Sequence, residues 1–532
     1  MRTPQDEQES AATGAEGSPG PRRRPRTHRT AALCGVLAAG LTLGVGQLVA
    51  GVVSPSAAPL VVVGDAVVDR VPAWLKDVAV RTFGTSDKVV LLSTIAVLVL
   101  ALAALAGVLA RRRLAAGVAL VAVLGGVGVL AAATRPDASA LSPLPSALGA
   151  AAGAYALTLL TRRLAPAPAG AAQEQRPPRR AVLLGGVAAA GLATGGAGQA
   201  LVAVRSAERS RSRVVLPAPA DPAPALPAGL DPAEALASGL TTYATRTADF
   251  YRIDTALVVP DVVAEEWSLR IHGDVEREVV LGFDELLAKP LRERWITLTC
   301  VSNEVGGSYV GTARWLGYPL ANLLEQAGVR GGADMLLATS VDGFTLSAPL
   351  AEATDGRDAM LVVGMNGEPL PREHGFPVRM VIPGLYGYVS ACKWVTDIEV
   401  TRFAEKTAYW TDRGWAQRGP IKTASRVDVP KSFAKVRAGT VPVAGVAWAQ
   451  HRGISRVEVR VDEGEWQQAR VLPSASSDTW CQWVWEWNAT ETGNHSLQVR
   501  ATDGTGAVQT DVVAAPIPDG ASGYDSVSVT VV

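Results

Sequence analysis

The chain has 532 residues, 48% of them hydrophobic and 19% charged, and its formal net charge is zero. This length exceeds one hydrophobic core, so we expect two or three folded units, and without a basic excess we expect no nucleic-acid partner. The chain has five histidines, and its four cysteines show no Cys-x-x-Cys spacing, so a zinc cluster or a disulfide framework is not expected. Any metal would then draw most of its ligands from outside the protein.

The first 204 residues have the features of a membrane region. Residues 1–29 are polar, rich in Pro and Gly, and end in RRRPRTHR, which predicts a disordered cytoplasmic tail. Residues 30–204 contain about five apolar stretches long enough to cross a bilayer. These are residues 31–53, 89–110, 114–133, 144–161 and 181–204. The first three are nearly free of charge and apolar on every face, so we predict helices in contact with membrane lipid.

Arginine-rich segments fall on alternate sides of these stretches, and the positive-inside rule assigns them to the cytoplasm. They are residues 22–29, Arg111–Arg113, and the group Arg162, Arg163, Arg176, Arg179 and Arg180. An odd number of spans then places everything after about residue 205 outside the cytoplasm. A further group opposes this orientation but is outweighed by the three consistent segments; it comprises Arg205, Arg209, Arg211 and Arg213.

The last apolar stretch has a second interpretation. Arg179 and Arg180 precede a Gly- and Ala-rich, weakly apolar sequence, which resembles a twin-arginine export signal. That pathway carries folded proteins and would suit a domain that receives its cofactor in the cytoplasm. Alternatively, the two arginines anchor the last membrane helix. Residues 205–240, rich in Pro and Ala, are predicted to form a semi-rigid linker.

Residues 241–420 have the composition of a globular domain. Alternation from Trp295 predicts a strand that ends at Cys300, and the Gly-rich loop after it has a backbone that can approach a ligand closely. Pro319 and Gly328 bracket a predicted helix. Further strands are expected at about 335–340, 344–348 and 359–363. Strands mixed with short helices, without a repeating βαβ pattern, predict an α+β domain.

Residues 421–532 have an all-β pattern. Val457, Val459 and Val461 alternate before a turn, and a row of alternating tryptophans shares a face with Cys481. These are Trp483, Trp485 and Trp487. The pattern predicts an immunoglobulin-like β-sandwich, with the tryptophan row in its core or at an interface.

Four motifs from residue 245 onward carry a family resemblance. They are TLTCVSN, GTARWLGYPLANLL, MNGEPLPREHGFPVRMVIPG and SACKW. Together they resemble the sulfite oxidase family of molybdopterin enzymes, and the C-terminal region resembles that family's dimerisation domain. The resemblance implies a Mo-molybdopterin cofactor and a homodimer formed through the C-terminal domain. It does not extend to the membrane region.

The resemblance also assigns roles to individual residues. Without it, Cys300 is best interpreted as a small buried hydrophobe. In the family, the matching cysteine supplies the single protein thiolate to molybdenum, and the dithiolene of the pterin supplies two more sulfurs. Arg379 and Lys393 match residues that contact the pterin, and suit its terminal phosphate as a forked donor and a point charge. The other implied cofactor contacts are Tyr251, Asp254, Asn303, Thr339, His374 and Ser390.

Some positions depart from the family pattern. Animal and plant members carry arginines for the anionic substrate where this chain has Glu304 and Val305, and the family's active-site tyrosine corresponds to about Val363. A pocket without those arginines should bind sulfite poorly, although Arg314 could supply a replacement cation. The chain contains no CxxCH haem motif, so we expect a separate electron-transfer partner.

The sequence therefore predicts a multi-pass membrane protein with an extracytoplasmic molybdopterin domain that catalyses oxygen-atom transfer, with sulfite or a sulfoxide as the substrate. A membrane-tethered binding or adhesion protein with a cofactor-free domain is the alternative. A cysteine hydrolase is a third hypothesis, with only His272 or His374 as base, and neither histidine has an evident orienting partner in the sequence.

Overall fold

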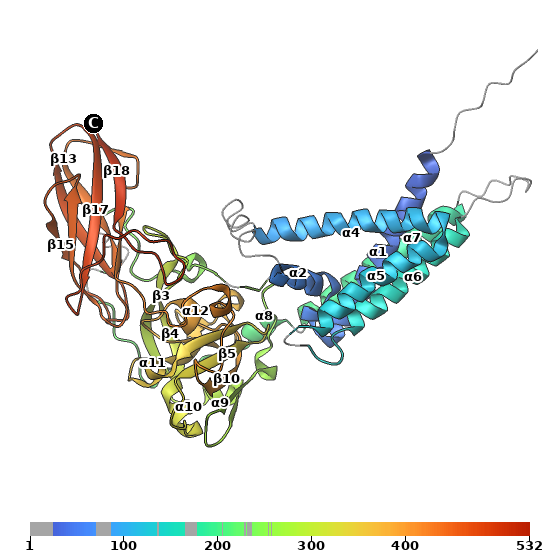
Figure 1. Ribbon diagram of the computed structural model, residues 1–532, viewed down its shortest axis with the longest axis horizontal. Coiled ribbons are helices and arrows are strands. Elements are labelled where there is room, and N and C mark those ends of the chain that lie inside the picture. Colours follow the sequence, from blue (N-terminus) through green and yellow to red (C-terminus); the bar gives the residue numbers. More distant parts are fainter. Residues whose placement is uncertain are drawn as a thin grey trace, which may run out of the picture.

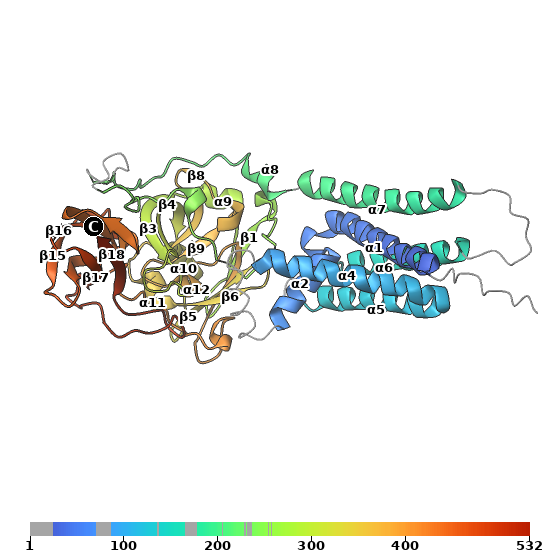
Figure 2. The same cartoon turned by 90° about the horizontal axis from the view of Figure 1, so that it is seen from above.

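The computed structural model describes residues 25–70, 87–135, 138–164, 178–204, 206–227, 230, 237–253, 255–256 and 258–532. Three parts follow one another along the long axis: a group of long helices, a mixed α+β unit, and a β-rich unit at the C-terminus (Figures 1 and 2). Most of the predicted tail lies outside the described residues, and its last residues belong to the first helix, which begins at Pro25.

The helical part contains the predicted apolar stretches. Its helices are α1 (Pro25–Val53), α2 (Pro59–Arg70), α4 (Asp87–Arg112), α5 (Leu114–Ala133), α6 (Leu144–Arg163) and α7 (Pro178–Val204). The short α8 (Ala207–Arg211) packs instead on the α+β unit, where Ala207 is buried and Ser210 Oγ donates to Glu265 at 2.6 Å. Within the described residues, five helices are long and apolar enough to cross a membrane. They are α1, α4, α5, α6 and α7, and each coincides with one of the stretches expected from the sequence.

Small residues allow these helices to approach one another closely. A Cβ added at Gly35 of α1 would lie 1.9 Å from the carbonyl oxygen of Ala103 in α4, and one added at Gly107 would lie 2.0 Å from that of Ala31. Backbone contact of this kind is typical of helix pairs in lipid. At the end of α5, an Arg135–Asp65 ion pair of 3.0 Å links this helix to α2.

The α+β unit consists of two sheets and several short helices. One sheet has the order β2-β1-β10-β5-β6, and the other has the order β3-β4-β7-β8, with β9 paired to β7. The strands are β1 (Ser268–Gly273), β2 (Val279–Gly282), β3 (Arg292–Thr299), β4 (Val310–Pro319), β5 (Met335–Ser340), β6 (Thr345–Pro349), β7 (Met360–Met365), β8 (Glu368–Pro369), β9 (Arg379–Val381) and β10 (Val395–Thr401). The helices are α9 (Phe283–Leu287), α10 (Leu320–Ala327), α11 (Leu350–Thr354) and α12 (Gly387–Ser390).

Local sequence signals account for several of these elements. Helix α10 begins after Pro319 and ends at Gly328, whose φ of 69° is the left-handed conformation that glycine accepts without strain. Strands β5, β6 and β7 lie close to the positions expected from the sequence. Short helices separate strands that pair mostly antiparallel, so no βαβ repeat is present among the described residues of this unit.

The β unit is β-rich as predicted, but its described strands do not confirm an immunoglobulin-like sandwich. They follow one hydrogen-bonded path, β11-β13-β16-β15-β14-β17-β18-β12, in which β15 pairs with both β14 and β16. The strands are β11 (Ala424–Val429), β12 (Ala434–Val436), β13 (Gly439–Trp448), β14 (Ile454–Val461), β15 (Gln467–Val471), β16 (Cys481–Ala489), β17 (Gly493–Asp503) and β18 (Asp525–Val531). Trp483 and Trp487 are buried together with Cys481, as expected of core residues.

A shared apolar cluster joins the β unit to the α+β unit. Trp448 and Trp480 of the β unit pack in one buried cluster with Val310 and Tyr386 of the α+β unit. Tyr243, from the segment before β1, belongs to the same cluster, and its hydroxyl donates to Thr479 at 2.6 Å. The two units therefore form a continuous interior, which matters for the site because β3 lies at this junction.

The close contact at Gly35 can be tested by substitution. Gly35→Val should destabilise the helical part by roughly 1–3 kcal/mol, because its side chain would overlap the backbone of α4. Gly40→Val in the same helix is the control, since a Cβ there meets no atom within 4 Å. Unfolding of the detergent-solubilised protein in sodium dodecyl sulfate measures both, and equal stability of the two variants would contradict this packing.

Candidate active site

Strand β3 delivers Cys300 to a buried position. Its last four residues, Ile296–Thr299, are all buried, and Cys300 itself is 9% exposed. The Cys300 amide donates to the carbonyl oxygen of Tyr309 at 2.9 Å. Asn303 closes the loop between them, because its Oδ1 accepts the Tyr309 amide at 2.7 Å. Asn303 therefore shapes the Cys300 loop.

A cavity opens beside Cys300, and aromatic side chains form much of its wall. The aromatic residues are Phe250, Tyr251, Phe344, Tyr388, Trp394, Trp410 and Trp415. Several of these rings contact one another, as in the Trp410–Trp415 pair, whose ring centroids lie 6.2 Å apart. Besides Cys300 and the two tyrosines, the charged or titratable residues of the wall are Arg252, Asp342, His374, Arg379 and Lys393.

Three of the predicted cofactor contacts meet at the turn before β9. Gly375 has a φ of 107°, and a Cβ there would lie 3.1 Å from atoms of both Arg379 and Lys393, so a glycine permits this close approach. Arg379 Nη1 donates to the carbonyl oxygen of His374 at 3.2 Å, and its guanidinium lies 5.1 Å from the Trp315 ring. Lys393 Nζ donates to a carbonyl oxygen at 3.2 Å and lies 4.6 Å from an indole ring. The turn therefore gathers a cationic cluster beside the thiol.

Burial and like charge set the protonation states here. Burial lowers the pKa of Arg379 to about 10, so this guanidinium remains charged at neutral pH. Burial, followed by the charges of Arg379, Lys393 and Arg252, lowers the pKa of His374 to about 3, which keeps its imidazole neutral. Burial raises the pKa of the Cys300 thiol. The cavity thus places positive charge and a protonated thiol side by side, and it suits an anionic group.

Some of the predicted site residues line the cavity beside Cys300, and others do not. Cys300, Tyr251, His374, Arg379 and Lys393 all line the cavity.

The described cavity wall does not include Asn303, Thr339 or Ser390. Thr339 lies in β5, paired with Thr345 and Asp397, and Ser390 Oγ donates to two carbonyl oxygens of its own helix region at 3.0 Å. Asp254 lies outside the described residues.

Arg314 and Glu304 also lie away from the described lining of the cavity. Arg314 Nε is 3.1 Å from Glu293 Oε1, and its guanidinium lies 5.8 Å from the Trp295 ring. Glu304 is exposed to solvent. The replacement cation expected at Arg314 is therefore engaged elsewhere, and repulsion from Glu304 is screened by water.

Other lining residues were not predicted from the sequence. Arg252 follows Tyr251, and Ser340 and Asp342 follow Thr339, so each lies within three residues of a predicted contact. Trp410 and Trp415 lie beyond β10, in a segment without a family motif among those quoted above. The adjacency of Arg252 to Tyr251 was the available signal for a third cation in the cavity wall, besides Arg379 and Lys393.

Comparison with known proteins identifies relatives of this region. The oxidoreductase molybdopterin binding domain matches residues 256–410. Mitochondrial sulfite oxidase of Mus musculus is 30% identical over 307 residues, covering 48% of this chain and 56% of the relative, so the chain spans a little over half of that protein. The uncharacterized oxidoreductase YuiH of Bacillus subtilis is 32% identical over 154 residues, covering 29% of this chain and 74% of that protein.

A solved structure is similar as well. The sulfane dehydrogenase SoxCD from Paracoccus pantotrophus superposes with a TM-score of 0.48 at 23% identity, covering 55% of this chain and 82% of that chain.

Proposed function

Because the chain belongs to the sulfite oxidase family of molybdopterin oxidoreductases, we propose that the cavity beside Cys300 holds its Mo-molybdopterin, and that the protein is a membrane-anchored enzyme of oxygen-atom transfer. The observation that carries this proposal is the convergence of one cysteine, a neutral histidine and two buried or half-buried cations on a single cavity. Bound Mo-molybdopterin supplies the two-electron redox chemistry and the oxygen-atom transfer.

The cavity residues fit an anionic cofactor. Arg379 is 5% exposed, and its Nε has no hydrogen-bond partner. Ser340 is 3% exposed, and its Oγ also has no hydrogen-bond partner. Buried polar atoms are rarely left without partners, so donors of this kind that line a cavity indicate a ligand. A phosphate could accept from Arg379 and Lys393, and the dithiolene would add two sulfurs to that of Cys300.

Each residue then has a definable task. Cys300 must ionise to bind a metal, and since burial opposes this, the metal's own charge has to favour the thiolate. Neutral His374 can donate one hydrogen bond without adding charge. The aromatic wall gives the cavity a largely apolar lining, against which charge interactions are stronger than in bulk water. None of these tasks requires the chain to provide a second protein ligand to the metal.

The charge of the cavity bears on the substrate. The wall carries three cations against one carboxylate, Asp342. If Arg379 and Lys393 bind the phosphate, Arg252 is the remaining cation of the described wall. Sulfite, with about two negative charges, needs paired cations in a water-poor pocket, and losing one charged hydrogen bond costs roughly 1.5–3 kcal/mol. The aromatic wall and a single arginine therefore favour a neutral sulfoxide over sulfite.

Both reactions balance with two electrons. Reduction of a sulfoxide consumes two electrons and two protons, and yields a thioether and water. Oxidation of sulfite consumes water, and yields sulfate, two protons and two electrons. In either direction we propose that a separate protein carries the electrons, since the sequence contains no CxxCH motif.

The proposal extends to location and assembly. The alternating arginine segments support an extracytoplasmic site, and the five apolar helices support a membrane anchor. We retain residues 421–532 as an immunoglobulin-like domain that forms a homodimer, and Arg179–Arg180 as an export signal or an anchor. Residues 30–204, 205–240 and 241–420 are retained as membrane region, linker and catalytic domain.

Two earlier hypotheses are set aside. A cofactor-free binding protein does not agree with the family assignment, which includes the cofactor. For a cysteine hydrolase, the sequence indicated no orienting partner for His272, and this was wrong: its Nε2 lies 3.0 Å from Asp397 Oδ1. His272 is nevertheless absent from the described wall of the cavity that contains Cys300, so it cannot serve that thiol as a base.

Cys300→Ser should abolish turnover while leaving the fold intact, because a hydroxyl is a harder and more basic donor than a thiol. The measurements are turnover per molybdenum, metal content, and thermal unfolding of the purified full chain. Turnover equal to that of the wild type would show that Cys300 is not the metal ligand.

Arg252→Met should raise the Michaelis constant for sulfite about two- to fivefold and leave that for dimethyl sulfoxide unchanged, because only the anion uses this guanidinium, which is exposed and partly screened by solvent. Steady-state kinetics with an artificial electron mediator measures both, with Arg314→Met as the control. A micromolar Michaelis constant for sulfite in the wild type, lost on Arg314→Met, would contradict the assignment of the pocket.

The orientation predicts that a reporter fused after residue 240 is active only if the reporter is one that folds outside the cytoplasm. Paired fusions to alkaline phosphatase and to a cytoplasm-only fluorescent protein test this. Strong fluorescence with no phosphatase activity would reverse the topology.

A further inference from the structure

The outer edge of β3 is hydrogen-bonded by the β unit. Strand β3 is the first strand of its sheet, so one side of its backbone is open to partners from outside the sheet. There the Thr297 amide donates to the carbonyl oxygen of Asp478 at 2.9 Å, and the Trp480 amide donates to Thr297 Oγ1 at 2.8 Å. The strand that ends just before Cys300 is thus hydrogen-bonded along its edge by residues more than 150 positions further along the chain.

Gln450 contacts the same strand nearest to its end. Its Nε2 donates to the carbonyl oxygen of Thr297 at 3.1 Å and to Thr299 Oγ1 at 2.8 Å. The Gln450 side chain is 0% exposed, and both threonines are buried. Because Thr299 directly precedes Cys300, this one carboxamide binds the backbone of Thr297 and the side chain of the last residue before the thiol.

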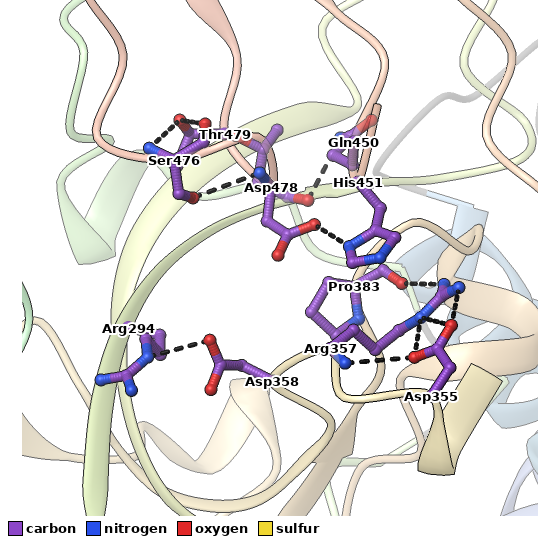
Figure 3. A network of polar contacts seen from close by, with 11 residues as sticks. Arg294, Asp355, Arg357, Asp358, Pro383, Gln450, His451, Ser476, Asp478 and Thr479 are labelled. Carbon is purple, nitrogen blue, oxygen red and sulfur yellow. Dashed lines mark hydrogen bonds and ion pairs between the residues drawn. The ribbon is translucent and has the colours of Figure 1, made fainter. Parts of the chain in front are cut away.

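The two segments that hold β3 also support each other. His451 follows Gln450 in a left-handed conformation, with a φ of 68°, and its Nδ1 lies 3.2 Å from Asp478 Oδ1. Figure 3 shows the His451 ring directed at the Asp478 carboxylate, with Arg357 of the α+β unit nearby, where it donates to the carbonyl oxygen of Pro383 at 2.8 Å. The position of Gln450 is therefore supported by contacts between its own segment and the segment of Asp478, which also binds β3.

We propose that Gln450 is a positioning residue for Cys300, so that the β unit sets the orientation of the thiolate toward the metal. The inference rests on Cys300 as the metal ligand. Without the carboxamide, the Thr297 carbonyl and the Thr299 hydroxyl would lose partners in a buried site, and the strand end would shift to find new ones. Partners that orient metal ligands typically account for 10- to 100-fold in metal affinity or activity.

The matched control is a second buried glutamine of the β unit. Gln482 is 6% exposed, and its Nε2 donates to the carbonyl oxygen of Thr241 at 2.6 Å, outside β3. Gln450→Met and Gln482→Met remove the same group from the same unit with little change in volume. A difference between them therefore reports on β3.

The test uses the full-length holoenzyme and three readouts. We expect Gln450→Met to lower turnover of dimethyl sulfoxide per molybdenum about 10- to 100-fold and to alter the electron paramagnetic resonance spectrum of the molybdenum. We expect faster hydrogen exchange at the amides of residues 297–300, in the cofactor-free chain as well. Gln482→Met should match the wild type in all three. An unchanged spectrum and unchanged exchange in Gln450→Met, with turnover within twofold of the control, would overturn the proposal.

A second variant keeps the proposal testable if Gln450→Met fails to fold. Thr299→Val removes only the bond to Oγ1 and should shift the spectrum and the exchange rates in the same direction, by less. In this background Gln450→Met should have a smaller effect than alone, because the two residues share one interaction. An unchanged spectrum and exchange pattern in Thr299→Val would count against the positioning role. A wild-type protein without molybdenum would overturn the proposed function instead, while the exchange measurement still tests the contact.

Discussion

The buried guanidinium of Arg379 is the main electrostatic constraint on this site. Arg379 is 5% exposed, remains charged with a pKa of about 10, and has an Nε without a hydrogen-bond partner. A buried charge is costly unless an opposite charge offsets it, so the α+β unit is built to receive an anion. Burial, followed by the charges of Arg379 and Lys393, lowers the pKa of His374 and keeps its imidazole neutral. The anionic cofactor that we propose for this cavity would supply that partner.

The sequence predicts the elements whose signals are local. Helix α10 is bracketed by Pro319 and Gly328, and β3 is marked by alternation up to Cys300. The near misses in the site have a geometrical cause. Ser340 rather than Thr339 lines the cavity, because successive residues of a strand point to opposite faces. Around α12, the lining residues Gly387, Tyr388 and Ala391 follow helical spacing, and Ser390 falls on the other side.

Contacts between distant segments lie beyond single-sequence reasoning. The engagement of Arg314 depends on the pairing of β3 with β4, which brings Glu293 within 3.1 Å of its side chain. The hydrogen bond from Gln450 to Thr299 of β3 joins residues that are 151 positions apart in the sequence. Neither follows from periodicity or composition. They support the proposal that the β unit contributes to the site, because it shares a buried cluster with the α+β unit and hydrogen-bonds to the strand before Cys300.

The account as a whole depends on one thiolate from the chain joining the two sulfurs of the cofactor. X-ray absorption at the molybdenum edge of the purified wild-type protein counts these sulfurs directly. We predict three sulfur ligands, one of them from Cys300. Two sulfur ligands, or a spectrum without molybdenum, would contradict the account.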